Sequence, residues 1–188
     1  SWEAWNDPQG PGSDQDRISA KMLRFRFDYP EAYYQGWMYW PSSYLTSSGK
    51  RYVNLFQWKE RASPWNPTWI LAVVPDEENR DVFAVHDAVG QRVTRTGTSV
   101  PKDRWVHIAA WLKASRTAGE LWLWVDGQLI ARRAGINTLG GPTNTGPGGL
   151  MWGIGNYGGV AIGRSVWWDD AQVAQIGPTT TSATCATR

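Results

Sequence analysis

Cysteine and histidine are nearly absent from this sequence of 188 residues. The only cysteine is Cys185, so the chain has no internal disulfide. The two histidines, His86 and His107, lie far apart in the chain. A zinc site needs several Cys or His ligands at short spacing, so the sequence gives no support to a zinc centre. A chain of this length can still bury a core by packing alone.

Net charge and long apolar runs are also lacking. Nineteen Lys and Arg against seventeen Asp and Glu leave a formal charge of +2, too small to indicate a nucleic-acid partner. No apolar run approaches the roughly 20 residues that span a bilayer, and no signal-peptide pattern is present. We therefore expect no nucleic-acid and no membrane partner. The expected location is extracellular, which would make this a mature or excised secreted domain.

Helical periodicity is missing too, and short β-rich segments alternate with Gly, Pro, Asn and Asp. Residues 68–74, TWILAVV, are apolar throughout, as expected for a strand buried between two layers. Asp126-Gly127 is typical of a tight hairpin turn. About ten short strands without helices predict an all-β, two-sheet antiparallel jelly-roll sandwich. The expected strands are 19–28, 34–40, 54–61, 68–74, 82–86, 104–113, 120–125, 128–131, 160–164 and 166–176.

The two ends of the chain differ from its middle in composition. Residues 1–16 and 177–188 are polar and contain Pro and Gly, so we expect them to pack weakly. The length predicts a single domain, residues 1–178. Residues 179–188 form a Thr/Ser-rich tail or linker, which favours attachment to a larger multidomain protein.

Tryptophan is abundant, with 14 residues. A pyranose stacks its apolar C–H face on an indole while its hydroxyls bond to polar neighbours, so exposed Trp suits a glycan site. Trp37 and Tyr39 share one face of their strand, and Trp122 and Trp124 share one face of theirs, opposite aliphatic residues. Two interpretations stay open: these rings fill the space between the sheets, or some of them form a platform. Four further tryptophans lie near predicted loops that could rim such a platform: Trp65, Trp152, Trp167 and Trp168.

Four segments follow one another in a familiar order: YYQGWMYWP at 33–41, NLFQWK at 54–59, WVHIAAWLK…GELWLWVDGQ at 105–128 and LMWGIGNY at 150–157. Together they resemble the polysaccharide lyases of concanavalin-like fold, a group with heparin-lyase-like, alginate-lyase-like and glucuronan-lyase-like members. The resemblance implies a jelly roll of the concanavalin A-like lectin/glucanase type, whose concave sheet forms a glycan groove. It also implies that Tyr157, which ends the last segment, stands at a catalytic tyrosine position.

The chain departs from that group at two positions. Such lyases carry Gln-x-His on the groove strand, where this chain has Gln57-Trp58-Lys59. They also carry a Lys ahead of Gly and Tyr on the late strand, where this chain has Gly153. The expected histidine and lysine are therefore missing, whereas Gln57 and Tyr157 are present.

β-Elimination from a uronic acid needs a group that neutralises the carboxylate, a base for the C5 proton and an acid for the leaving oxygen. Gln57 with Arg24 or Arg26 could bind the carboxylate. Tyr157 could act as base and acid beside a cation such as Lys59, and Lys59 could itself be the base if burial lowers its pKa. In the alternative interpretation, Gln57 and Lys59 are solvated residues at a strand end and Tyr157 is a packing residue.

Histidines and acidic runs leave further alternatives open. His107 lies on the less aliphatic face of its strand and could donate to a sugar hydroxyl or be structural, and His86 beside Asp87 is interpreted as structural or surface-exposed. Residues 76–78 and 169–170 could bind a structural Ca²⁺ or form ordinary charged turns. No cofactor is expected apart from this possible calcium.

Three functions follow from these patterns. The first is a carbohydrate-binding module that recognises a polysaccharide through an aromatic concave face. The second is a polysaccharide lyase that cleaves an acidic glycan with Gln57, Lys59 and Tyr157, and the third is a protein-interaction domain. We favour binding over catalysis because of the two departures. The predicted ligand-binding residues are Arg24, Arg26, Trp37, Tyr39, Gln57, Lys59, His107, Trp122, Trp124 and Tyr157.

Overall fold

A computed structural model describes most of the chain. The described backbone comprises residues 2–5, 17–25, 30–44, 52–61, 67–142, 144, 147–157 and 165–174. Side chains are described within 30–44, 53–61, 67–142, 144 and 166–174. These residues form strands and turns without a helix, so none of them could provide a membrane-spanning helix. Outside them lie Arg26, Trp65, the strand expected at 160–164 and the tail at 179–188.

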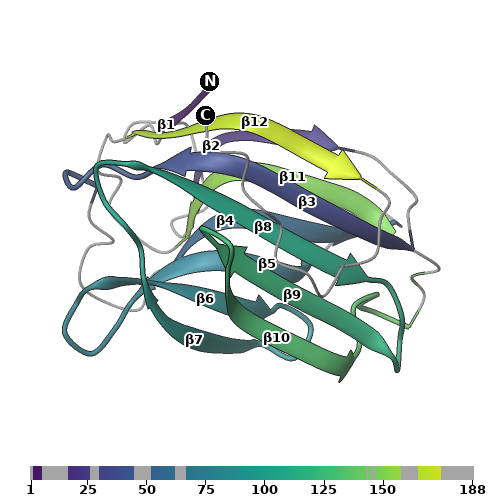
Figure 1. The fold of residues 1–188 in the computed structure, drawn as a ribbon. Coiled ribbons are helices and arrows are strands. Elements are labelled where there is room, and N and C mark those ends of the chain that lie inside the picture. The colour runs from purple at the N-terminus through teal and green to yellow at the C-terminus, as the bar shows by residue number, and fades with distance from the viewer. Residues whose placement is uncertain are drawn as a thin grey trace.

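The described strands form two six-stranded antiparallel sheets that pack face to face (Figure 1). Sheet A has the order β1 (Trp2–Trp5), β12 (Ser165–Ala174), β3 (Glu31–Tyr39), β8 (Trp105–Lys113), β9 (Gly119–Val125) and β10 (Gln128–Ile136). Sheet B has the order β2 (Arg17–Phe25), β11 (Pro147–Tyr157), β4 (Tyr52–Glu60), β5 (Pro67–Pro75), β6 (Asp81–Asp87) and β7 (Arg92–Ser99). The predicted all-β, two-sheet antiparallel sandwich is confirmed.

Strands from the two ends of the chain interleave in both sheets. In sheet A, β12 lies between β1 and β3, and in sheet B, β11 lies between β2 and β4. Strand β8 also pairs with β3, whereas β4 to β7 and β8 to β10 follow chain order. This combination of local hairpins and long-range pairing is the jelly-roll arrangement. It brings residues that are far apart in the sequence onto one sheet.

The core lies between the sheets and follows from the two-residue period of a strand. Burial alternates strictly along β3 and β9, which therefore give one face to the core and one to the outside. Strand β5 is buried at all seven of its inner positions, as predicted for 68–74. The largest fully buried side chains are Trp40, Trp168, Tyr34, Tyr44, Phe56, Phe83 and Met38.

The hairpin between β9 and β10 has the predicted turn at Asp126-Gly127. Both residues have positive φ, 48° and 77°, as a two-residue turn of the primed type requires. The Asp126 side chain also accepts from the backbone N–H of His107 at 2.9 Å and from Arg104 at 2.7 Å. The turn is thereby attached to the start of β8.

Two edge strands were not predicted from the sequence. Strand β7, RVTRTGTS, is exposed at every second position or more and has few apolar residues. An edge strand with Arg and Thr side chains lacks the hydrophobic alternation that identifies a strand. Strand β1 lies within an N-terminal segment that we expected to pack weakly, yet it pairs with β12 along its whole length.

Candidate functional site

Large aromatic side chains cover the outer surface of sheet A. Their neighbours along β3, β8, β9 and β12, such as Tyr34, Ile108, Leu121 and Trp168, lie in the core, so alternation turns the aromatic residues outward. We call this surface the aromatic face. It consists of Tyr33, Trp37, Tyr39, Trp105, Trp111, Trp122, Trp124 and Trp167.

The rings of the aromatic face touch one another across neighbouring strands. At one end Tyr39 lies between Trp105 and Trp167, with both ring centroids 5.7 Å away. These three residues are direct register partners on β8, β3 and β12. Edge-to-face contacts of this kind hold aromatic pairs in a defined orientation. The rings therefore form an ordered surface with fixed neighbours.

A second ring cluster lies at the β9 end of the aromatic face. The Trp122 centroid is 5.4 Å from that of Trp111 and 5.9 Å from that of Trp124, and Tyr33 lies 6.2 Å from Trp124. Trp111 is only 4% exposed, and its indole N–H finds no hydrogen-bond acceptor among the described residues. A buried donor without an acceptor is uncommon in folded proteins and indicates a position where a ligand atom could bind.

His107 and Trp37 form a further ring pair on the aromatic face. The His107 ring lies 5.2 Å from that of Trp37, its register partner on β3. Burial lowers the pKa of His107, and the Asp126 carboxylate opposes this only in part. The imidazole is therefore neutral near pH 7 and offers one donor and one acceptor nitrogen. His107 lies on the less aliphatic face of β8, as predicted, because Val106, Ile108, Ala110 and Leu112 all lie in the core.

The outer surface of sheet B has a different character. Gln57 lies in one cross-strand row with Ile70 and His86, and Asn54 lies in the next row with Ala72 and Ala84. We call the surface around Asn54, Gln57, Lys59 and His86 the polar face. Asn54 and Gln57 are each 1% exposed, so Gln57 is not the solvated strand-end residue of the alternative interpretation. Phe56 and Trp58 point the other way, into the core.

Asn54 is the most unusual residue of the polar face. Neither its amide nitrogen nor its amide oxygen has a hydrogen-bond partner among the described residues. Leaving a buried amide unpaired costs about 1–3 kcal/mol.

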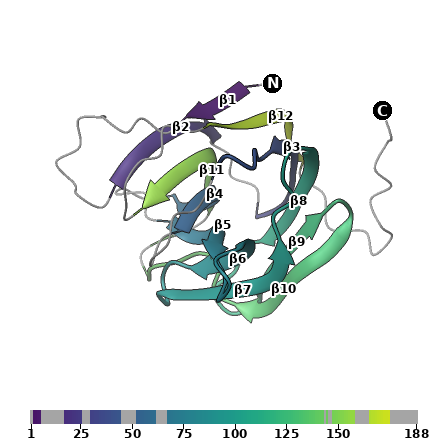
Figure 2. The same cartoon turned by 90° about the vertical axis from the view of Figure 1, so that its left-hand side faces the viewer.

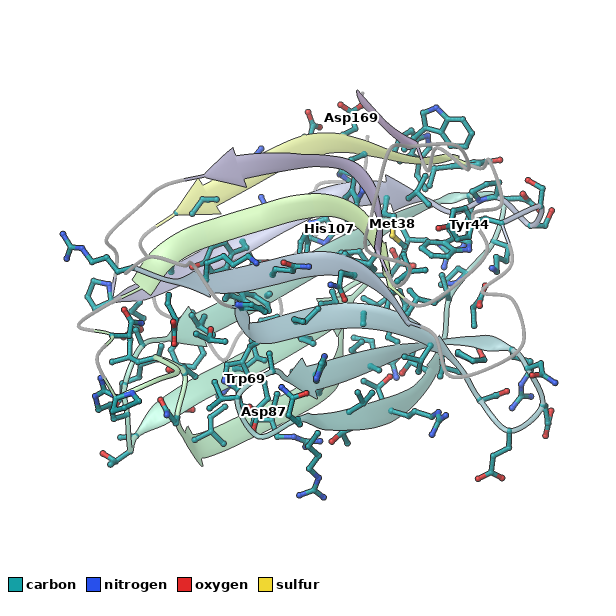
Figure 3. The ribbon with its side chains drawn as sticks, turned by 180° about the vertical axis from the view of Figure 1, so that it is seen from behind. Met38, Tyr44, Trp69, Asp87, His107 and Asp169 are labelled. Atoms are coloured by element: carbon teal, nitrogen blue, oxygen red, sulfur yellow. The ribbon has the colours of Figure 1, made fainter. Side chains whose placement is uncertain are left out.

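Burial lowers the pKa of His86 on the same face, against a smaller opposing effect of Asp87. Trp69 of β5 and Asp87 of β6 are register partners and lie side by side in the view onto this sheet (Figure 3).

The register of β11 separates two of the predicted catalytic residues. Tyr157 is paired with Tyr52, whereas Gln57 is paired with Met151. The two positions are therefore five residues apart on β4, roughly 16 Å of extended strand. Arg24 is closer in register, because its partner on β11 is also Met151. The backbone register thus places Arg24 and Gln57 in one row and Tyr157 several rows away.

The predicted ligand-binding residues consequently lie on two surfaces. Five of them belong to sheet A, and Gln57 and Lys59 belong to the polar face of sheet B, with the core between the two layers (Figure 2). The prediction of a single aromatic face that includes Gln57 and Lys59 is therefore wrong, because β3 and β4 belong to different sheets. Trp168, expected near a rim, is fully buried in the core. The sheet A members are Trp37, Tyr39, His107, Trp122 and Trp124.

The acidic run at 76–78 forms a turn. Asp76 accepts from the backbone N–H groups of Glu78 and Arg80 and from the Arg80 guanidinium at 2.8 Å. These hydrogen bonds, led by the Arg80 N–H, lower the pKa of Asp76. The described residues contain no group of three or more Asp, Glu, His or Cys that could hold a metal ion. The hydrogen bonds to Asp76 agree with the charged-turn interpretation of residues 76–78.

Solved structures of polysaccharide lyases share this fold at low sequence identity. An endo-β-1,4-glucuronan lyase from the fungus Trichoderma reesei matches with a TM-score of 0.62 and 13% identity, over 93% of this chain and 79% of that chain. A mutant of alginate lyase Aly36B in complex with alginate tetrasaccharide matches with a TM-score of 0.64 and 12% identity, over 92% and 86%. A SAP-like pentraxin from Limulus polyphemus matches with a TM-score of 0.53 and 11% identity, over 94% and 77%.

No protein-family model and no curated protein matches the sequence. The structural matches confirm the resemblance to the concanavalin-like polysaccharide lyases at the level of fold. Because lyases and a pentraxin share the same sandwich, the fold does not decide the activity. The activity has to be inferred from the side chains of the two outer faces.

Proposed function

We propose that this chain binds a polysaccharide and that the aromatic face of sheet A is its binding surface. The observation that carries the proposal is a pair of ring clusters on one face, Tyr39 with Trp105 and Trp167, and Trp122 with Trp111 and Trp124, which together extend over four neighbouring strands. Sugar rings stack on such indoles, and a polysaccharide presents several rings in a line. A surface that extends over several strands suits a chain better than it suits one small molecule.

The partial exposure of these rings supports a role in ligand binding rather than in packing. The outer face of a sandwich normally carries polar residues, and a contiguous apolar patch there indicates an interaction site. Trp105 is 39% exposed, and Trp37, Trp122 and Trp124 are each partly exposed. Polar groups that can bind hydroxyls lie among them, including the Gln35 amide, which donates to Gln172 at 2.8 Å. Apolar platforms with interspersed polar groups are what glycan binding requires.

A binding assay with paired variants tests the proposal. The purified domain is titrated calorimetrically with a panel of soluble polysaccharides, and Trp37→Ala and Trp124→Ala are compared with the parent chain. Loss of a central aromatic contact should weaken binding at least about tenfold. Val93→Ala, an exposed apolar residue on the edge strand β7, is the control and should leave affinity unchanged. If no polysaccharide binds but a protein partner does, the protein-interaction alternative replaces this proposal.

A second candidate, lyase activity at the polar face of sheet B, is favoured by the unpaired amide of Asn54. A buried amide beside Gln57 could bind a sugar carboxylate and its neighbouring hydroxyl, and Arg24 lies in the same row as Gln57. His86 is held neutral by burial, as a base for the C5 proton must be. This arrangement gives the base role to His86, because Tyr157 lies several rows away.

Formation of unsaturated product separates the two candidates. A lyase raises the ultraviolet absorbance of an acidic glycan as double bonds form. Gln57→Ala should then lower turnover by about two orders of magnitude or more, whereas Trp124→Ala should act mainly on binding. Binding without product leaves the chain a carbohydrate-binding module. Such a module, located outside the cell and joined to a larger protein, is the setting we propose.

A further inference from the structure

Arg132 ends the aromatic row at the edge of sheet A. The register places Tyr33, Trp111, Trp122 and Arg132 side by side on β3, β8, β9 and β10. The Arg132 side chain is exposed, and its Cζ lies 4.4 Å from the centroid of the Trp122 ring. A guanidinium at this distance stacks on the indole by cation–π attraction and keeps its N–H groups free at its edge.

Three other arginines of the described chain, Arg80, Arg104 and Arg116, have acceptors. Arg80 pairs with Asp76 and Glu78, and Arg104 pairs with Asp126. Arg116 donates to three backbone carbonyls in the 141–144 loop. The Arg132 guanidinium, by contrast, has neither a carboxylate nor a carbonyl acceptor among the described residues. It is held in position by a ring and lacks an acceptor.

Two donors at this end of the aromatic face have no acceptor among the described residues. One is the Arg132 guanidinium, and the other is the Trp111 indole N–H in the same row. The two carboxylates nearby, Glu31 and Glu120, are both in register with Lys113, and Glu120 accepts from the Trp122 indole N–H at 3.1 Å. Two donors without acceptors complement a ligand rich in acceptor oxygens.

We propose that Arg132 binds an anionic substituent of the polysaccharide, a carboxylate or a sulfate, and that Trp122 positions Arg132 for this contact. The inference rests on the proposed function and adds the substrate class to it. Because Arg132 covers the Trp122 ring, stacking of sugars falls to the other rings, such as Trp124 and Trp37. Arg132 and Trp122 then determine charge selectivity, and the remaining rings determine affinity for any sugar chain.

The opposite end of the aromatic face carries carboxylates. Asp169 is in register with Trp37, and Asp170 follows it. At the Arg132 end the carboxylates of Glu31 and Glu120 flank Lys113, so the positive charges of Lys113 and Arg132 offset them. Repulsion from Asp169 and Asp170 and attraction by Arg132 therefore act in the same direction on an acidic chain. The anionic substituents of the ligand should therefore lie toward β9 and β10, away from β12.

Matched ligands with and without charge test this inference. The probes are oligomers of galacturonate and mannuronate, their methyl esters, and a sulfated oligosaccharide with its desulfated form. The parent chain should bind a charged form more tightly than its neutral counterpart. Arg132→Gln should lose about three- to tenfold in affinity for the charged form, with no change for the neutral form. Trp122→Ala should show the same selective loss, and Arg132→Lys should recover part of it.

Two controls keep this result separate from the proposed function. Arg133→Gln removes the same charge one residue away, and it should change affinity by less than about twofold because Arg133 lacks the Trp122 support. Trp124→Ala should weaken charged and neutral forms alike. One outcome is that Arg132→Gln binds every probe as the parent does, while Trp124→Ala loses affinity for the probes. Charge recognition by Arg132 is then refuted, and polysaccharide binding stands. If the parent binds none of the probes or other glycans, both proposals fail.

Discussion

The outer faces of the two sheets differ in the kind of side chain that they present. Sheet A turns large rings outward and leaves many of them partly exposed, whereas sheet B turns outward small and aliphatic residues around buried amides. Rings such as Trp122 and Trp124 contact each other, and the outward rings together offer a broad apolar surface. Asn54 and Gln57 offer hydrogen bonds in a confined setting. A sandwich can thus carry a surface for stacking and a separate surface for polar recognition, with one core between them.

The largest expected effect separates the aromatic face from the core beneath it. Trp167 and Trp168 are neighbours on β12 but lie on opposite faces. Trp168→Ala should reduce the free energy of unfolding by about 3–5 kcal/mol, because it leaves a large cavity in the core. Trp167→Ala should cost about 1 kcal/mol or less. Denaturant titration followed by circular dichroism measures both, and equal losses would show that the two faces are wrongly assigned.

A smaller effect distinguishes two asparagines that are equally buried. Asn54 and Asn144 are each 1% exposed, but Asn144 accepts from the Arg61 N–H at 3.0 Å and donates to the Leu139 carbonyl. Asn54→Leu should raise the free energy of unfolding by about 1 kcal/mol, since it removes an unpaired amide, whereas Asn144→Leu should lower it by about 1–3 kcal/mol. A clear loss of stability in Asn54→Leu would mean that its amide is paired in the free protein.

The smallest effect concerns pH and involves one histidine on each face. Burial lowers the pKa of both His107 and His86 below the ordinary value of 6.5. The unfolded chain therefore takes up protons first as the pH falls below 6.5, and the free energy of unfolding should decrease. Denaturant titrations at successive pH values from neutral to mildly acidic should show this decrease. His107→Asn and His86→Asn should each flatten it, and a profile that neither variant changes would contradict the assigned burial.

Much of the fold could be predicted from local patterns. Alternation in β9 correctly grouped Trp122 with Trp124, and the Asp126-Gly127 pair correctly marked the hairpin. A period of two identifies which residues of a strand share a face. It does not say to which sheet the strand belongs. The edge strand β7 gave no such signal, because its outward and inward positions are both polar.

The candidate site was harder to predict, because the period of two does not say to which sheet a strand belongs. Trp37 and Gln57 were assigned to one surface, although β3 and β4 belong to different sheets. Membership of a sheet is set by long-range pairs such as β3 with β12 and β4 with β11, which no local pattern encodes. Arg132 was missed because its role depends on its cross-strand neighbour Trp122. The unpaired amide of Asn54 was likewise invisible without its surroundings.

The indole N–H signals of the tryptophans offer the most direct test of the central claim. A proton–nitrogen correlation spectrum resolves each indole, and single Trp→Phe variants assign them. On titration with a bound oligosaccharide, the signals of Trp37, Trp105, Trp122, Trp124 and Trp167 should shift, while those of the core residues Trp40, Trp58 and Trp168 stay in place. Shifts confined to the side-chain amides of Asn54 and Gln57, with the aromatic face unchanged, would contradict the account and move the glycan to sheet B.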